Sequence, residues 1–434
     1  MARADAFVRD APAALPAFPR PTVLTRRFLP LLFSALAALV VLHAAPARAQ
    51  TPGAGEPDLS KVRIRMGPLS LNPSIALTNI GVDNNVFNEP DEAKPKSDFT
   101  FTLQPATDLW LHTGPTWVTG RIQEDLVWFQ TYSSERSVNA TYSAGWLVPL
   151  TRLRFNVNAT RRNLRDRPGF EIDARSQRFE TEYTGSIEVR TLSKTYFGIS
   201  AARQHVDFDK DAIFLNRNLQ FELNRETTSA GATVRYQMTP LTGITLAATR
   251  SQDRFEFSSL RDSNSTAATA SLNFDPLALI RGSMTVGYRD FEPLSPGLAA
   301  YKGLTASGNL SYVLYGSTKF TFGVNRDVQY SYDVNEPYYL LTAFTGSIAQ
   351  QLFGPIDVTA RAGVNSLAYR DRAGAAVVVS DRVDRGHAFG GGVGYHTSSG
   401  FRIGFDVDQT NRVSDISSRQ YNDLRIGTSV TYVF

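Results

Sequence analysis

The sequence contains no cysteine and, beyond its first fifty residues, no apolar run long enough for a membrane helix. The absence of cysteine excludes disulfide bonds and suits a protein of the cell envelope, where oxidation chemistry acts on thiols. The absence of long apolar runs excludes a bundle of membrane-spanning helices. If this chain crosses a membrane, it does so with strands.

The one long apolar run, residues 28–42, is short for a membrane span. Arg26 and Arg27 precede it, and the small-residue sequence Ala47-Arg48-Ala49 follows it. A basic region, an apolar region and a small-residue cleavage site are the parts of a secretory signal peptide. We therefore predict that residues 1–49 are a signal peptide, cut before Gln50.

Removal of this leader also removes the excess of positive charge. Residues 1–49 hold six Arg and two Asp, which leaves 39 basic and 39 acidic residues in the mature chain. The basic pI of the full sequence therefore comes from the leader, and it does not indicate nucleic-acid binding.

The last eleven residues, 424–434, alternate between apolar and polar side chains with a period of two, which predicts a strand. This strand ends on an aromatic carboxyl terminus, with no residue left to cover its apolar face. Lipid covers such a face in a transmembrane β-barrel. The ending resembles the terminal signature of bacterial outer-membrane proteins, which implies that Tyr432 and Phe434 form the signal read by the barrel-assembly machinery.

From residue 70 onward, alternating segments are joined by short turns and longer loops in strict succession. The eight short turns fall at residues 112–115, 149–151, 192–194, 240–243, 276–278, 315–317, 354–355 and 397–400. The nine longer, more polar connections fall at about residues 83–97, 130–134, 164–176, 208–223, 258–263, 292–301, 332–337, 371–383 and 414–419.

Tight periplasmic turns and longer outer loops are typical of outer-membrane barrels. We therefore predict an all-β fold, a transmembrane antiparallel up-and-down barrel of about 18 strands (range 16–20), over residues 70–434. Residues 50–69 would form a periplasmic segment, and residues 70–82 would pair with the last strand to close the ring. A soluble sandwich shows the same alternation, but it does not explain the leader, the turn asymmetry and the terminal Phe together.

Aromatic residues gather near both ends of the predicted strands, as in the interfacial girdles of membrane barrels. One residue fits this pattern badly. Glu124 falls among the outward residues Ile122, Leu126 and Trp128. Because a lipid-facing carboxylate is costly, we expect a bulge there or a position near the rim.

Several short motifs resemble the "β-barrel porin 2" family of outer-membrane proteins, over about residues 62–434. They are Met66-Gly67-Pro68-Leu69-Ser70-Leu71-Asn72-Pro73, Asp83-Asn84-Asn85-Val86-Phe87, Thr239-Pro240-Leu241-Thr242, Asp253-Arg254-Phe255-Glu256-Phe257, Gly287-Tyr288-Arg289-Asp290-Phe291 and Arg326-Asp327-Val328-Gln329-Tyr330-Ser331-Tyr332. The resemblance implies the barrel architecture. Some members of that family look linked to exopolysaccharide production, and such a link would be implied here by analogy alone.

No catalytic or metal-binding pattern emerges from the residues. The histidines of the mature chain, His112, His205, His387 and His396, are far apart and are best explained as solvated residues of turns and rims. The acidic run at residues 207–211 begins like a calcium loop but lacks its glycine and its closing acid, so a solvated loop is favoured. No acid, base and nucleophile are clustered. We predict that the protein is not an enzyme and needs no cofactor.

The alternation places charges of both signs on the inward face of the barrel. The candidate pore-lining residues are Arg152, Arg154, Arg178, Glu180, Glu182, Glu188, Arg190, Arg235, Arg250, Arg281, Arg289, Asp357, Arg361, Arg402, Asp406 and Arg425. In an open channel such charges create a transverse field that favours polar solutes. In a plugged barrel they form salt-bridge networks instead. The width expected of 16–18 strands favours the channel.

Two long central loops, residues 164–176 and 208–223, are candidates to fold into the lumen and constrict it. Four arginines lie near the first: Arg161, Arg162, Arg165 and Arg167. They would either face the constriction or bind the phosphates of lipopolysaccharide at the outer rim, and the sequence does not decide between these roles.

The function that these features favour is a porin-like channel of the Gram-negative outer membrane, for passive diffusion of small polar solutes. The alternatives are a conduit or accessory in exopolysaccharide secretion, and a structural or adhesion barrel with a filled lumen. The expected partners are outer-membrane lipid and lipopolysaccharide, the barrel-assembly machinery, and small polar solutes or polysaccharide, with no role for nucleic acid.

Overall fold

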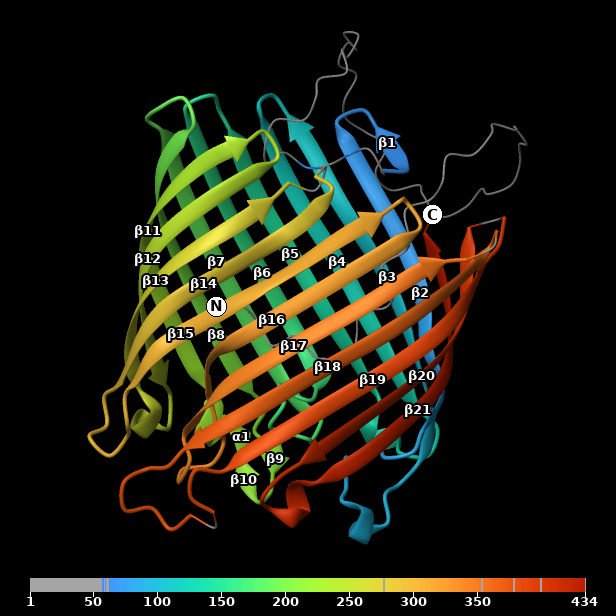
Figure 1. Ribbon diagram of the computed structural model, residues 1–434, viewed down its shortest axis with the longest axis vertical. Helices are drawn as coiled ribbons and strands as arrows, with labels where there is room; N and C mark the ends of the chain where they lie inside the picture. Colours follow the sequence, from blue (N-terminus) through green and yellow to red (C-terminus); the bar gives the residue numbers. More distant parts are fainter. Residues whose placement is uncertain are drawn as a thin grey trace.

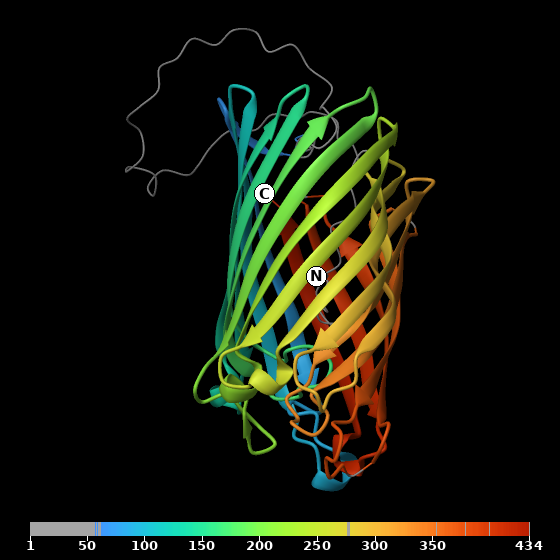
Figure 2. The ribbon, with the colours of Figure 1, turned by 90° about the vertical axis from the view of Figure 1, so that its left-hand side faces the viewer.

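A closed ring of eighteen antiparallel strands forms the body of the protein in the computed structural model (Figures 1 and 2). The structure describes residues 57, 59, 62–275, 278–352, 354–377, 379–398 and 400–433. The predicted signal peptide and Phe434 of the predicted assembly signal lie outside these residues. Among the described residues, no helix is long and apolar enough to cross a membrane.

Each strand pairs with its neighbours in sequence order. The barrel strands are β2 (Leu69–Asp83), β3 (Asp98–Thr113), β4 (Thr116–Phe129), β5 (Ser137–Pro149), β6 (Leu153–Asp166), β7 (Ser176–Arg190), β8 (Thr195–Phe208), β11 (Arg225–Thr239), β12 (Thr242–Phe255), β13 (Ser263–Phe274), β14 (Ile280–Pro293), β15 (Tyr301–Leu314), β16 (Thr318–Tyr330), β17 (Tyr338–Gln351), β18 (Ile356–Arg370), β19 (Val383–His396), β20 (Phe401–Val413) and β21 (Tyr421–Val433).

The last strand closes the ring on the first. Strand β21 pairs with β2, with Val82 opposite Ile426 and Asp83 opposite Arg425. The predicted strand number and the predicted closing pair are therefore confirmed. A short additional strand, β1 (Ile64–Met66), pairs with the start of β2. It lies within the segment that the sequence assigns to the periplasm.

The two ends of the barrel differ as the turn pattern predicts. Short turns, the β1–β2 hairpin and the end of β21 gather at one end, the inner end (Figure 1). The long loops gather at the other, the outer end. They carry the hairpin β9 (Ile213–Phe214) and β10 (Arg217–Asn218), helix α1 (Leu219–Leu223), and 3-10 turns η1 (Asp91–Ala93), η2 (Ser133–Glu135), η3 (Ser259–Arg261) and η4 (Ser417–Arg419).

Side chains alternate between two faces along every barrel strand. On β20, Phe401, Ile403 and Phe405 are exposed on the outward face. Arg402 lies buried on the inward face between them. Apolar residues cover the outward face because lipid, rather than a second sheet, contacts it.

The ladder shifts its register at two places: Leu77–Ile80 of β2 and Gln237–Thr239 of β11. At Glu124 the pairing of β4 with β5 continues without a shift, so of the two expected arrangements, a bulge or a position near the rim, the bulge is absent. Glu124 stays on the outward face, five residues from the outer end of β4. The hydroxyl of Tyr142 donates a hydrogen bond of 2.8 Å to its carboxylate and so reduces the cost of that position.

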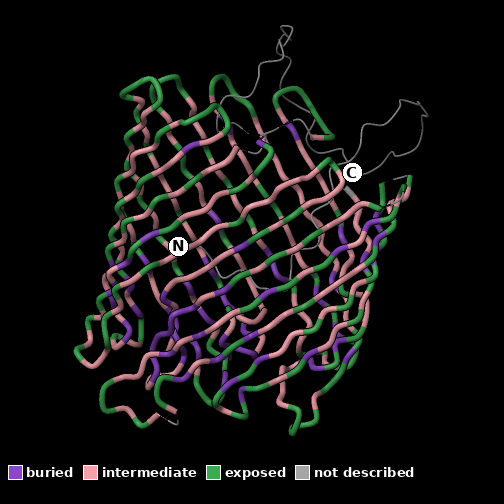
Figure 3. Tube along the Cα trace, in the orientation of Figure 1, coloured by how far each residue is buried: buried purple, intermediate pink, exposed green. Residues whose placement is uncertain are grey.

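Buried residues gather in the outer half of the barrel rather than along its whole length (Figure 3). Four clusters of buried apolar side chains form there, and each includes residues from the outer ends of strands or from outer loops. The outer end is therefore the part of the barrel that loops fill.

Candidate functional site

The loop of residues 167–175, which joins β6 to β7, crosses the lumen near its outer end. Gly169 makes a turn with a φ of 77°, a conformation that a side chain would disfavour. Phe170 then packs against five buried residues on β17 and β18: Tyr339, Leu341, Ala343, Leu367 and Tyr369. Because β17 and β18 lie halfway round the ring from β6 and β7, the loop spans the barrel. We call residues 167–175 the constriction loop.

A buried ion-pair cluster fixes the far end of this loop. The Asp173 carboxylate lies 2.6 Å from Arg412 and 3.1 Å from Arg419. The same two guanidiniums donate hydrogen bonds to the backbone carbonyls of Phe170 and Glu171. We call Asp173, Arg412 and Arg419 the latch. Because these side chains are buried, removing one partner leaves an uncompensated charge.

Glu171, in the middle of the constriction loop, is buried, with only 2% of its surface exposed. Its carboxylate accepts a hydrogen bond of 2.6 Å from the hydroxyl of Ser331. Burial raises the pKa of Glu171 to about 7, although Arg419 and Arg382 nearby oppose this rise. Burial also raises the pKa of Glu336 to about 7, despite its ion pair of 2.7 Å with Arg382.

The second predicted loop, between β8 and β11, packs against the first. Leu219 and Leu223 of α1, with Phe214 of β9, share one apolar cluster with Ile172 of the constriction loop. Glu222 pairs at 2.7 Å with Arg261 of a neighbouring outer loop. The prediction that one of the two central loops reaches into the lumen holds for the first, and the second supports it.

Two cavities lie along the constriction loop and have three lining residues in common. The outer cavity, of about 570 Å³, opens between the outer loops. The inner cavity, of about 150 Å³, lies between the constriction loop and the wall formed by β18–β21 and β2–β4. Val86, Asp173 and Arg175 line both cavities and so lie between them; we call these three residues the neck.

The inner cavity is lined by equal numbers of acidic and basic side chains. These are Asp83, Asp166, Asp173, Asp423, Arg167, Arg175, Arg412 and Arg425. Arg425 lies 2.9 Å from Asp83 and 3.1 Å from Asp423. Arg167 donates to two backbone carbonyls, those of Asp173 and Val86, each at 2.7 Å. The passage is therefore polar and its charges are largely compensated.

Further from the loops, β19 has only small residues on its inward face between Asp384 and His396. They are Gly386, Ala388, Gly390, Gly392 and Gly394. Arg361 of β18 reaches across them to Asp406 at 3.0 Å and Asp408 at 2.9 Å, both on β20. Arg402 of β20 reaches back to Asp357 at 2.6 Å. Ion pairs thus join β18 and β20 across the small residues of β19, although these two strands are not paired with each other.

Gly392 is where this arrangement is most easily tested. A Cβ added at Gly392 would overlap the Asp406 carboxylate and lie 2.8 Å from the carbonyl of Phe405, whereas one added at Gly391 would meet only the Thr359 carbonyl, at 3.6 Å. We expect Gly392→Ala to destabilise the folded barrel by about 1–3 kcal/mol, because the backbone contact cannot move aside. Thermal unfolding in detergent measures this, with Gly391→Ala as the matched control. Equal melting temperatures for both variants would contradict the prediction.

Most of the predicted lumen residues lie on the inward face, and several are paired there. The pairs are Arg178–Asp166 at 2.5 Å, Arg178–Glu180 at 2.8 Å, Arg162–Glu182 at 3.6 Å, Arg235–Glu188 at 2.6 Å and Arg289–Asp327 at 2.8 Å, besides those of Arg361, Arg402 and Arg425. The basic residues that lie toward the inner end are Arg152, Arg154, Arg190 and Arg281. Whether these residues line a conducting pore stays a prediction.

Arg250 was placed on the wrong face by the sequence. It shares the outward face of β12 with the exposed Leu246, whereas Ser251 and Asp253 lie inward. Its ladder partner on β11 is Ala230, which is also exposed. Ala247 and Ala248 beside it are both small, so the apolar contrast that identifies a lipid face is missing at this point.

The four arginines near the constriction loop divide between the two roles left open by the sequence. Arg162 lies inward beside Glu182, and Arg167 belongs to the constriction loop. Arg161 lies outward and exposed, on the same face of β6 as Val157. Arg165 lines the outer cavity. His396, expected in solvent, lies 2.7 Å from the buried carboxylate of Asp357.

The latch itself was missed by the sequence reasoning. Arg412 and Asp173 are 239 residues apart in the chain, so no local pattern joins them. Two weaker signals were present. The period of two that places Arg402 and Asp406 inward also places Arg412 inward. Residues 170–173 alternate apolar and acidic side chains, which is unusual for a solvated loop.

A protein-family model described as "Putative beta-barrel porin 2" matches residues 56–434. The chain belongs to this family. Membership in this porin family places the protein in the outer membrane. Porins of this family are channels rather than enzymes. Within the described residues, no group of three or more His, Asp or Glu is placed to hold a metal ion.

Solved structures of other porins are similar to this chain in the path of the backbone. A BenF-like porin from Pseudomonas fluorescens Pf-5 is 13% identical, with a TM-score of 0.46, over 85% of this chain and 100% of that one. The outer membrane protein OpdK from Pseudomonas aeruginosa is 11% identical, with a TM-score of 0.45, over 84% and 98%. OccK2 (OpdF) from Pseudomonas aeruginosa, solved in complex with glucuronate, is 11% identical, with a TM-score of 0.46, over 84% and 98%. A search of curated proteins gives no match.

Proposed function

We propose that this family member is a passive outer-membrane channel for small polar solutes, with the neck beside the constriction loop as its narrowest point. The observation that carries the proposal is the loop itself, which spans the lumen but leaves a polar cavity of about 150 Å³ against one wall. This volume holds roughly five water molecules, which suits a small solute.

The lining supports small polar solutes over apolar ones. Four carboxylates and four guanidiniums line the inner cavity, so a solute that passes exchanges its hydration for hydrogen bonds on both sides. Solute identity would then follow from size and hydrogen bonding at the neck.

Single-channel recording of the refolded protein in planar bilayers tests this proposal. We expect steady conductance steps in salt alone, partly reduced when small sugars or amino acids fill the neck. A barrel that conducts only after a polysaccharide or a partner is added would support the secretion conduit instead. A barrel that stays silent under every condition would contradict both and support the filled barrel.

A further inference from the structure

Three arginines on the outward face of the barrel lie at one level. Arg161 on β6, Arg203 on β8 and Arg250 on β12 each stand five residues before the outer end of their strand. Since these strand ends together form the outer rim, the three guanidiniums are at a similar depth below it. All three residues are exposed.

These arginines face lipid rather than the lumen. Toward the inner end, the same strand faces carry exposed apolar side chains: Val157 on β6, Ile199 on β8 and Leu246 on β12. The wall formed by these strands is turned toward the viewer in Figure 2. The arginines therefore mark the level at which the apolar band of this wall ends.

Their spacing leaves each side chain accessible. One strand separates Arg161 from Arg203, and one separates Arg203 from Arg250; with the two-residue offset of the ladder, neighbouring sites are about 12 Å apart. At the same level the intervening strands carry the small residues Thr181 and Ala230, whereas Tyr183, the direct ladder partner of Arg203, lies on its inner-end side.

The positive charge at this level is only partly balanced by the protein, although the carboxylate of Glu124 stands at the same level on β4. Arg161 and Arg250 make no hydrogen bond or ion pair with any described residue. Arg203 pairs at 2.7 Å with Glu226, yet 64% of its side chain stays exposed. An unpaired guanidinium on the lipid face is unfavourable unless an anion from the membrane meets it.

We propose that this wall binds lipid A, the bisphosphorylated disaccharide anchor of lipopolysaccharide, through Arg161, Arg203 and Arg250. Phosphate accepts paired hydrogen bonds from a guanidinium, and a disaccharide with a phosphate at each end can bridge two arginines on alternate strands. Its acyl chains would lie along the exposed apolar residues closer to the inner end. This inference concerns the outer surface and does not depend on what passes through the lumen.

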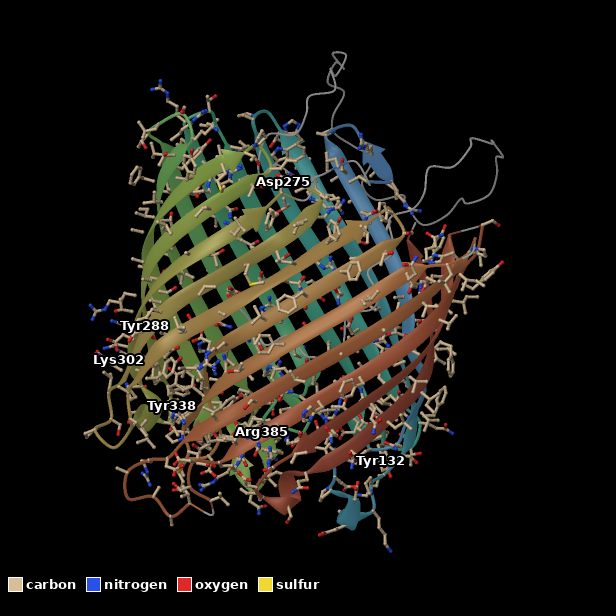
Figure 4. All side chains as sticks on the ribbon, in the orientation of Figure 1. Tyr132, Asp275, Tyr288, Lys302, Tyr338 and Arg385 are labelled. Carbon is tan, nitrogen blue, oxygen red and sulfur yellow. The ribbon has the colours of Figure 1, made fainter. Side chains whose placement is uncertain are left out.

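The opposite wall supplies a matched control. Arg385 on β19 lies outward, exposed and without a partner among the described residues, halfway round the ring from β8 (Figure 4). It lies two residues from the outer end of its strand, and it has no second arginine on alternate strands at that level.

Native mass spectrometry of the detergent-extracted protein, titrated with lipid A, tests the proposal. We expect wild type and Arg385→Gln to bind lipid A equally, and Arg161→Gln/Arg250→Gln to bind it at least ten-fold more weakly. Monophosphorylated lipid A and phosphatidylglycerol should bind the wild type more weakly than bisphosphorylated lipid A does. Unheated gel mobility checks that each variant is a folded barrel.

Three results would contradict the proposed lipid A site. They are undiminished lipid A binding by the folded double variant, an equal loss of binding in Arg385→Gln, and phosphatidylglycerol binding as tight as that of lipid A. The last would mean that the wall attracts anionic lipid in general. Channel conductance in phospholipid bilayers should be the same for wild type and double variant, so failure here is distinct from failure of the proposed channel function.

Discussion

Asp173→Asn is expected to raise the single-channel conductance roughly twofold or more, because the neck widens when the constriction loop leaves its latch. Asp173 is the only carboxylate within ion-pair distance of Arg412 and Arg419 among the described residues. Breaking a buried pair by removing one charge costs about 3–5 kcal/mol. The cost is lowest if the constriction loop moves away and lets water reach Arg412 and Arg419, and this movement opens the lumen.

The control is Arg203→Gln, which removes an ion pair of similar length from the outward face. That pair is exposed, so its loss should leave both stability and conductance close to the wild-type values. An unchanged conductance in a folded Asp173→Asn variant would show that the loop does not limit the current. Permeation of sugars of increasing size into liposomes that contain either variant would give the largest solute that each barrel passes.

The barrel was predictable because lipid imposes a simple rule on each strand. Apolar side chains must alternate outward, as in residues 401–407, and tight turns must return the chain at the inner end. These constraints act within a hairpin and can be read locally. The strand number, the closing pair of β2 with β21 and the position of every outer loop followed from them.

The rule is less reliable where neighbouring residues are small. It is also less reliable where a hydrogen bond from another strand lowers the cost of a polar side chain on the lipid face. Arg250 lies beside Ala247 and Ala248, which suit either face, and it was placed inward because of its charge alone. For Glu124 a bulge or a position near the rim was expected, and no bulge is present. Instead the hydroxyl of Tyr142 on the next strand satisfies it on the lipid side. Neither outcome is visible in the sequence of one strand.

The interior of the outer end could not be predicted, since it depends on contacts between distant segments. The motif Asp83-Asn84-Asn85-Val86-Phe87 supported the family resemblance as a rim motif. Its structural role is wider: Asp83 pairs with Arg425 across the barrel seam, and the Val86 carbonyl accepts from Arg167 of the constriction loop. The motif therefore contacts both the closing strand pair, β2 with β21, and the constriction loop.

The second large effect we expect is a dependence of the conductance on pH. Glu171 is part of the constriction loop and is buried when the loop is docked; burial raises its pKa to about 7, so the docked loop favours the protonated carboxyl. Charged and titratable groups from every loop packed there surround it: Arg419, Arg382, Arg261, Glu336 and Tyr332. Glu336 has a pKa raised in the same direction and strengthens the effect.

For a carboxyl whose pKa is higher in the docked state, the stabilisation is fully present below its ordinary value near 4.5 and is lost as the pH rises through about 7. Between pH 5 and pH 8, docking of the loop should therefore weaken by about 2 kcal/mol from Glu171 alone. We expect a small, quiet conductance at pH 5 and a larger, fluctuating one at pH 8.

Glu171→Gln separates this mechanism from a general effect of pH on the lumen charges. Glutamine keeps the hydrogen bond to Ser331 but cannot ionise, so most of the difference between pH 5 and pH 8 should disappear while the quiet state persists. Glu336→Gln should remove a further part. If the wild-type conductance falls rather than rises from pH 5 to pH 8, or if Glu171→Gln keeps the full difference, another group controls the loop. The carboxylates of the latch and of the inner cavity would then be the next to test.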